Sequence, residues 1–157
     1  MLTSTKLPHP AELLPHRPPM LLLDEIQTYV PGESVTAATF VHPEMIFFEG
    51  HFPGEPILPG VILVEMMFQT CGLYGRLEAI NALPQEGSAS DPYRPKSGRA
   101  IKIDSLSFSK AVLPNDHLLI TSVFSHKLLN FSVFNARVEI IGRGTAAKGI
   151  VTVLITP

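Results

Sequence analysis

The chain has very little cysteine and little charge, and each shortage excludes a class of structure or partner. Its one cysteine, Cys71, rules out an intramolecular disulfide and a cysteine-rich metal site. Because Cys71 lies in an apolar segment, we expect a buried and unreactive thiol, which suits a reducing compartment.

Only 17% of the 157 residues are charged, and the formal net charge is −2. Recognition of nucleic acid requires a strongly basic surface, so we expect no nucleic-acid partner. No apolar run reaches the ~20 residues that a membrane-spanning helix needs, and no secretion signal is visible. We therefore expect a cytoplasmic protein without a membrane segment.

Apolar residues are abundant: 45% of the chain is hydrophobic, and the mean hydropathy is +0.24. A chain of this length commonly forms one domain, and we predict a single domain over residues 1–157. The many apolar residues indicate that a partner subunit covers part of the surface. We expect a homodimer or a dimer-based higher oligomer.

The apolar residues are densest from Val61 to Tyr74, where no polar face remains. This composition predicts a helix that is buried on all sides. Since proline suits the first helical turn, we expect the helix to begin at Pro59 or Gly60. The rest of the chain should wrap around it.

Alternation of apolar and polar residues between turn-forming residues predicts about six strands. They lie at residues 20–29, 34–41, 101–108, 118–126, 131–141 and 149–155. We expect the first two to form a hairpin and the last four to pair in meander order, which gives an α+β fold. Residues 1–10 are expected to be flexible, and residues 81–98, rich in Pro, Gly and Ser, should form an extended loop.

Two candidate functional groups lie between Gly50 and Gln69: His51, before a Pro/Gly-rich loop, and Glu65, inside the apolar helix. Carboxylates are almost never buried without a reason, so Glu65 attracts attention first. Gln69 lies one helical turn after Glu65, on the same face, where the two side chains can hydrogen-bond. Two alternatives stay open at this point. His51, beside Phe52, is a core residue instead of a base, and Gln69 is a purely structural partner of Glu65.

These residues resemble the hotdog-fold 3-hydroxyacyl-(acyl carrier protein) dehydratases of bacterial fatty-acid synthesis. The matching residues are Leu14-Pro15-His16-Arg17-Pro18, Leu22-Leu23-Asp24, Gly50-His51-Phe52-Pro53-Gly54, Pro56, Pro59-Gly60-Val61, Glu65 and Gln69. The central part is the most specific, because many residue identities recur there at set spacing. The resemblance implies a hotdog fold, an antiparallel sheet of about six strands wrapped around one long central helix.

The resemblance also implies a reaction and its residues. The family's enzymes are hydro-lyases, which remove water from a (3R)-hydroxyacyl thioester to give the trans-2-enoyl product. Their substrate is carried on the phosphopantetheine arm of acyl carrier protein, so no cofactor is expected. By this resemblance the catalytic residues are His51 and Glu65, which meet across a homodimer interface. Gly60 would bind the thioester carbonyl, Ile57 would hold the histidine ring through its carbonyl, and Gln69 would orient Glu65.

The residue types suit this elimination. It needs a base for the α-proton, an acid for the leaving hydroxyl and a donor for the enolate-like oxygen. Histidine ionises near neutral pH, which suits His51 as the base. Apolar neighbours favour the neutral form of Glu65, as an acid requires. The N–H of Gly60 lies at a helix start, where backbone donors lack intrahelical partners.

Three further residues are predicted to contact the substrate, namely Phe52, Met67 and Phe68. The resembled family usually carries small residues where this chain has Met67 and Phe68, so we expect these two to narrow an acyl tunnel. The alternative for both is a place in the core. The other histidines show no ligand spacing, so they are interpreted as surface or structural residues, and no metal site is predicted; they are His9, His16, His42, His117 and His126.

A basic run, Arg94, Lys96, Arg99 and Lys102, has no acidic residue between Asp91 and Asp104. It fits either a solvated loop and strand edge or a docking surface for acidic acyl carrier protein. Two other functions remain open for the whole chain: an acyl-thioester hydrolase on the hotdog fold, and a non-catalytic acyl-binding protein. The presence of both His51 and Glu65 favours the dehydratase, in fatty-acid or related polyketide or polyene synthesis.

Overall fold

The structure is a computed structural model, and it describes residues 6–82 and 98–155. In chain order the elements are α1 (Pro10–Leu13), β1 (Glu25–Val30), β2 (Ser34–Phe40), the short 3₁₀ helix η1 (Ile46–Phe48), α2 (Gly60–Asn81), β3 (Gly98–Phe108), β4 (His117–Leu128), β5 (Phe131–Ile140) and β6 (Gly144–Ile155). Most of the extended loop predicted at residues 81–98 lies outside the described residues.

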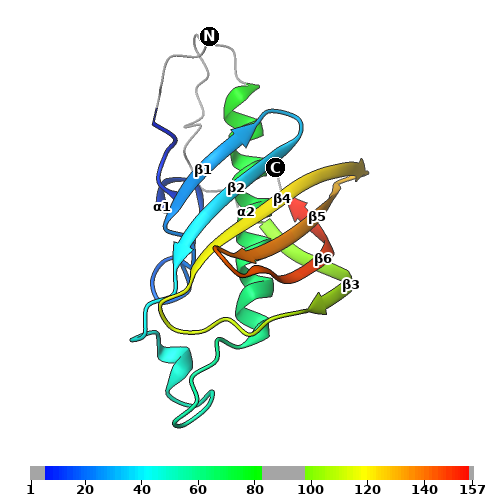
Figure 1. The fold of residues 1–157 in the computed structure, drawn as a ribbon. Coiled ribbons are helices and arrows are strands. Elements are labelled where there is room, and N and C mark those ends of the chain that lie inside the picture. The colour runs from blue at the N-terminus through cyan, green and yellow to red at the C-terminus, as the bar shows by residue number, and fades with distance from the viewer. Residues whose placement is uncertain (1–5, 83–97, 156–157) are drawn as a thin grey trace.

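A curved antiparallel sheet of six strands packs against α2, which lies behind the sheet in Figure 1. The strand order is β1-β2-β4-β5-β6-β3. The first two strands form the predicted hairpin, in which Val30 pairs with Ser34 across a tight turn containing Gly32. One long helix against such a sheet confirms the predicted α+β hotdog fold.

The predicted meander is wrong at its first step. β3 pairs with β6, and β4 pairs with β2 instead of with β3. Of the last four strands, β4, β5 and β6 follow one another as neighbours, as predicted. The alternating pattern of a strand indicates which face is buried, but it carries no information about which strand lies beside it.

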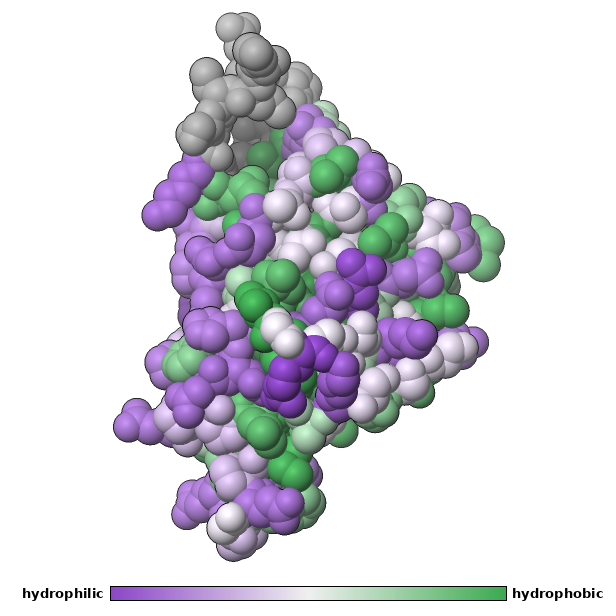
Figure 2. Space-filling view, viewed as in Figure 1, coloured by the Kyte–Doolittle hydropathy of each residue, from purple (hydrophilic) through white to green (hydrophobic). Residues whose placement is uncertain are grey.

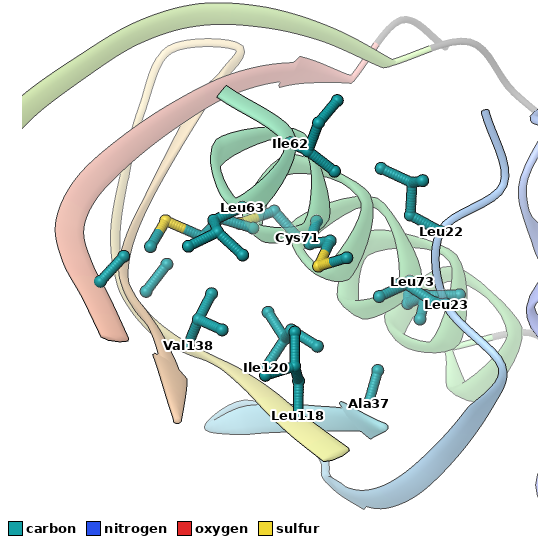
Figure 3. Close-up of a cluster of buried hydrophobic side chains, with 14 of the residues drawn as sticks. Leu22, Leu23, Ala37, Ile62, Leu63, Cys71, Leu73, Leu118, Ile120 and Val138 are labelled. Atoms are coloured by element: carbon teal, nitrogen blue, oxygen red, sulfur yellow. The ribbon is translucent and has the colours of Figure 1, made fainter. Parts of the chain in front are cut away.

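The core fills the space between α2 and the concave face of the sheet. Figure 3 shows Leu63, Cys71 and Leu73 of α2 near side chains from the strands, among them Ile120 and Val138. Every second residue of β2 and β5 is buried, as expected for strands with one face on a core. The expectation of a buried thiol is confirmed, since Cys71 is fully enclosed and donates to Ser122 Oγ at 3.3 Å.

The central helix differs from its prediction in length and in burial. It begins at Gly60 as expected but continues to Asn81, about two turns beyond Tyr74. It is not buried on all sides, because Val61 is 71% exposed and Glu65, Phe68 and Gly72 are partly exposed. These four residues follow a helical spacing of three to four and form one incompletely covered stripe.

The segment before β1 is not the strand that its apolar residues predicted. The N–H groups of Met20 and Leu21 both donate to the carbonyl of Arg17, and the N–H of Leu22 donates to the side chain of Gln69. These groups are therefore unavailable for a sheet, and β1 begins only at Glu25. The expected flexible segment does not reach Pro10 either, because that residue is buried at the start of α1.

Along β2 and β5, residues of the outer face alternate with the buried residues of the core face. In Figure 2 hydrophobic residues are scattered over the face in view and do not merge into one large patch. Exposed apolar residues occur on several elements, and two of them, Ile101 and Phe108, which are 47% and 52% exposed, lie on β3 at one edge of the sheet. β3 ends the sheet on this side, so one row of its backbone groups has no partner strand within the described chain.

Candidate active site

His51 lies in the segment between η1 and α2, and its ring is held by the backbone of the same segment. Nδ1 is 2.7 Å from the carbonyl oxygen of Ile57. A carbonyl only accepts, so Nδ1 carries a proton, and in the neutral ring Nε2 holds the lone pair. The backbone N–H of Ile57 also donates to the carbonyl of His51 at 2.9 Å. The contact with Ile57 that the resemblance implied is present, and it leaves His51 in the tautomer of a base.

The neighbouring loop keeps this histidine in place. Phe52 and Glu55 exchange two backbone hydrogen bonds, of 3.0 and 2.9 Å, and close a turn in which Gly54 has a φ of +76°. A positive φ is open to glycine at little cost. The ring of Phe52 stacks on the imidazole, with centroids 4.1 Å apart. Phe52 is 50% exposed, so half of its surface remains open to solvent.

Glu65 projects from the second turn of α2 and is held by Gln69. The Gln69 amide donates to Glu65 Oε1 at 3.0 Å and to the carbonyl of Met20 at 2.7 Å. Its oxygen accepts from the N–H of Leu22 at 3.1 Å. This pattern fixes the orientation of the amide, because only its NH₂ group can serve the carbonyl of Met20. Gln69 is therefore both the expected partner of Glu65 and a link between α2 and residues 20–22.

His16 is the functional candidate that sequence reasoning missed. Its Nε2 lies 3.3 Å from Glu65 Oε1, the same oxygen that Gln69 contacts. Nδ1 of His16 is buried and makes no hydrogen bond within the described chain. The signal was present, because His16 belongs to the Leu14-to-Pro18 segment that carries the resemblance. Its spacing from Glu65 gave no sign of contact, since the two lie on separate elements.

A cavity extends along the incompletely covered stripe of α2. His16, Glu65, Phe68 and Gln69 line one part of it. It continues beside Gly72, Gly75 and Arg76, and its other walls are residues 14–15, Gly98, Arg99, Ala100 and Val153. Neither His51 nor Gly60 is among the described residues that line this cavity. Within one chain, the structure brings Glu65, Gln69 and Phe68 together and leaves His51 apart.

Gly60 occupies a crowded position at the start of α2. A Cβ there would lie 2.9 Å from Cε1 of Phe108, so the close approach of this ring requires glycine. The residue before it, Pro59, provides no side-chain cap. The N–H of Ile62 donates to the carbonyl of Pro59 at 2.9 Å. The N–H groups of Gly60 and Val61 precede it at the positive end of the helix dipole, which suits a developing negative charge.

The structure places Met67 and Phe68 in different environments. Met67 has no exposed surface and belongs to the hydrophobic core, and it does not line the cavity beside Glu65. Phe68 is partly buried and does line that cavity. Consecutive helical residues point about 100° apart, so Met67 can face the core while Phe68 faces the cavity. Of the two residues only Phe68 lines the cavity, and its role in narrowing an acyl tunnel stays a prediction.

Half of the predicted basic docking run lies outside the described residues, namely Arg94 and Lys96. Of the other two, Arg99 lines the cavity, and Lys102 is paired with Asp104 at 3.2 Å. The docking role of all four residues stays a prediction.

In the part of the chain that the structure describes, no helix is long and apolar enough to cross a membrane. Over the same residues, no three His, Cys, Asp or Glu side chains group as metal ligands.

Comparison with known proteins places this geometry in a family. The FabA-like domain matches residues 14–147. The chain belongs to the FabA-like family. Among its relatives is a protein of Geobacter metallireducens named 3-hydroxyacyl-(acyl carrier protein) dehydratase FabZ, which is 36% identical over 134 residues, or 85% of this chain and 83% of the relative. A FabZ of Nitrosospira multiformis is 33% identical over 85% of each chain.

Solved structures share the fold of this FabA-like protein at lower identity. A chain of the dehydratase heterocomplex ApeI:P from Xenorhabdus doucetiae has a TM-score of 0.75 and 18% identity, over 97% of this chain and 93% of that one. A hypothetical thioesterase of Streptococcus pneumoniae, solved with coenzyme A, has a TM-score of 0.60 and 17% identity, over 84% of each chain. At such identities the likeness concerns the fold. The matches to FabZ proteins favour the dehydratase over a hydrolase.

Proposed function

We propose that this protein dehydrates a (3R)-hydroxyacyl thioester on acyl carrier protein to a trans-2-enoyl thioester, in fatty-acid or related polyketide or polyene synthesis. One observation carries the assignment within the family: the chain holds a histidine with a free Nε2 and a carboxyl fixed by Gln69 and His16. These are the base and the acid that an elimination requires.

The proposed reaction uses each group once. Nε2 of His51 removes the α-proton, and negative charge develops on the thioester oxygen. The N–H of Gly60, at the positive end of α2, donates to that oxygen. Glu65 then protonates the departing 3-hydroxyl, so water leaves and the double bond forms. No cofactor takes part, because each proton comes from or goes to a side chain.

We propose that the site is completed by a second copy of the chain. Three features support this: the cavity beside Glu65 lacks His51, the α2 stripe around Val61 is partly exposed, and the edge strand β3 carries exposed apolar residues. Pairing of two copies through these surfaces would cover apolar area that a monomer leaves in water. We expect this homodimer in the cytoplasm, where the single thiol of Cys71 stays reduced.

The assignment is tested by incubating the purified full-length chain with a panel of 3-hydroxyacyl carrier-protein thioesters and following the products by mass spectrometry. Loss of one water with the acyl group still on the carrier is the expected result. Release of a free acid and a free carrier thiol would indicate a hydrolase. Binding without any chemical change would indicate an acyl-binding protein.

The shared site has its own test. His51→Ala and Glu65→Gln proteins are each expected to be inactive, whereas a mixture that exchanges subunits should regain part of the activity. Heterodimers would contain one site with both native residues. If native mass spectrometry shows heterodimers and no activity returns, the two residues do not act across an interface.

A further inference from the structure

The first residue of α2 borders a side chain of β3. A Cβ added to Gly60 would have three ring carbons of Phe108 as its nearest neighbours outside the helix backbone, namely Cε1 at 2.9 Å, Cζ at 3.0 Å and Cδ1 at 3.4 Å. Glycine lacks that Cβ, so the aromatic ring packs directly on the backbone of Gly60. Phe108 is therefore the side chain that faces the start of the helix.

The backbone of Phe108 is fixed, although its ring lies outside the core. Phe108 pairs with Ala147 of β6, and the N–H of the next residue, Ser109, donates to the carbonyl of Ala146 at 2.7 Å. The side chain is 52% exposed and does not belong to the hydrophobic core. Because the core does not depend on this ring, its removal should affect the position of the helix start more than the stability of the fold.

The connection that follows β3 holds the residues just before the helix. In Figure 1 the chain leaving β3 passes beside the end of α2 at which the helix begins, and the N–H of Leu58 donates there to the carbonyl of Val112 at 2.8 Å. The carbonyl of the preceding residue, Ile57, accepts from His51 Nδ1. Residues 57–60 thus contain both the anchor of the proposed base and the proposed oxyanion donor, and the end of β3 with its connection contacts this segment twice.

We propose that Phe108 is a positioning residue for the dehydration, whose ring holds the N–H of Gly60 where negative charge develops on the thioester oxygen. This inference rests on the proposed function and names a further residue of the same site. Among the described residues the N–H of Gly60 makes no hydrogen bond, so it is free to donate to a substrate. Such a donor stabilises the transition state only when it lies within hydrogen-bond distance of the oxyanion, so its placement decides its effect.

The first test is Phe108→Leu, which keeps an apolar side chain but removes Cε1 and Cζ, the two atoms closest to Gly60. Its kcat for a 3-hydroxyacyl carrier-protein thioester should fall about tenfold or more, up to the roughly 10²- to 10³-fold that loss of one oxyanion donor costs. KM should change little, because the donor acts mainly in the transition state. An unchanged kcat in the folded variant overturns the inference and leaves the dehydratase intact.

Ile101→Ala is the matched control, because Ile101 is similarly exposed on the same strand and is not among the atoms nearest Gly60. It should keep the wild-type kcat. Size-exclusion chromatography of both variants reports the oligomeric state, and a loss of kcat that accompanies loss of the oligomer assigns Phe108 to the subunit interface and overturns the positioning role. If Phe108→Leu does not fold by circular dichroism, Phe108→Met provides the comparison.

The contact itself is tested by adding the missing Cβ. Gly60→Ala should lower kcat strongly in the wild-type background, because the new methyl group meets the ring of Phe108 and displaces the helix start. In the Phe108→Leu background the same methyl group no longer meets Cε1 and Cζ, so the further loss should be much smaller. Equal losses in both backgrounds would show that the two residues act independently, which contradicts the inference.

NMR provides a readout that does not depend on turnover. Butanoyl-pantetheine, a saturated thioester that cannot be dehydrated, should shift the amide resonance of Gly60 in the isotope-labelled full-length chain and in Ile101→Ala, and should shift it much less in Phe108→Leu. If no hydroxyacyl thioester is dehydrated but this response still depends on Phe108, the proposed function fails and the positioning role stands. No shift in the wild-type protein, or an equal shift in Phe108→Leu, contradicts the positioning role whatever the activity.

Discussion

At the scale of single residues, the two acid–base candidates are positioned in different ways. His51 is fixed by the backbone of its own loop, through the carbonyl of Ile57. Glu65 is fixed by side chains, since Gln69 comes from the same helix and His16 from the segment after α1. Both contacts to Glu65 are made to Oε1. The second carboxyl oxygen thus remains available to carry the proton.

Glu65→Gln separates catalysis from binding. The variant keeps nearly the same shape and still accepts from Gln69, but it has no proton to give to a leaving hydroxyl. We expect kcat to fall by roughly 10²- to 10⁴-fold while substrate affinity changes little. Stability should hold or rise, because a partly desolvated carboxyl is replaced by a neutral amide. Single-turnover kinetics with bound thioester measures this, and a near wild-type rate would remove Glu65 from the mechanism.

His16→Phe tests whether His16 acts through Glu65. Losing the contact to Oε1 should lower kcat about tenfold, the size of effect expected for one ordinary hydrogen bond, with little change in KM. In a Glu65→Gln background the same substitution should cost nothing further in kcat, because residues that act as a unit are not additive. His126→Phe, at an exposed position of β4, is the matched control. Equal losses in both backgrounds would assign His16 a separate structural role.

At the scale of elements, α2 has two different sides. One packs on the sheet and contributes the core, and the other is the stripe that borders the cavity. The sequence shows a helix of apolar residues all round, so its hydrophobicity does not distinguish the two sides. The distinction arises from where β3 and the segment around His16 lie, and both are remote in the sequence.

Alanine at Met67 and at Phe68 should therefore give different phenotypes. Met67→Ala removes a fully buried side chain and should cost about 2–5 kcal/mol in the free energy of unfolding, measured by urea denaturation. Phe68→Ala widens the cavity, so it should shift the preferred acyl length upward with the elimination chemistry intact. An unchanged chain-length profile in the folded Phe68→Ala protein would return Phe68 to the core.

Much of the fold was predictable because its signals are local. The α2 start at Pro59-Gly60, the β1–β2 hairpin and the strand faces follow from proline, glycine and alternation within short windows. The contact of His51 with Ile57 and that of Glu65 with Gln69 also lie within a few residues. Two of the features that sequence reasoning missed are contacts between residues remote in the sequence, β3 beside β6 and His16 beside Glu65. The different environments of Met67 and Phe68 likewise depend on which distant segments pack on each side of α2.

At the scale of the whole molecule, burial of Cys71 in the core makes the free energy of unfolding depend on pH in the alkaline range. Burial raises the pKa of the Cys71 thiol from 9.0 to about 12, although its hydrogen bond to Ser122 acts in the opposite direction. Burial also raises the pKa of Tyr29 and of Tyr74, with the charge of Glu78 adding to both shifts. In the unfolded chain these groups ionise at lower pH than in the folded protein.

A raised pKa of an acid stabilises the fold at pH values below the unfolded pKa, and this contribution disappears as pH rises. We expect the free energy of unfolding to decline between pH 9 and 12, the interval set by the two pKa values of Cys71. Urea denaturation at successive pH values measures this decline. In the Cys71→Ala protein the decline in the free energy of unfolding should be smaller, because only the contribution of the tyrosines remains. Identical slopes in both proteins would show that the thiol ionises equally in the folded and unfolded states.

The pairing of β3 with β6 also sets the order in which this molecule can be completed during synthesis. β3 is translated before β4, β5 and β6, yet among the described strands its one neighbour in the sheet is β6. While residues 109–143 emerge from the ribosome, the backbone of β3 has no strand to pair with. The edge of the sheet and the wall that β3 gives to the cavity therefore form only after residues 144–155 have been made. A nascent chain truncated before β6 has α2 with Glu65 but lacks the surface that would recruit a second copy.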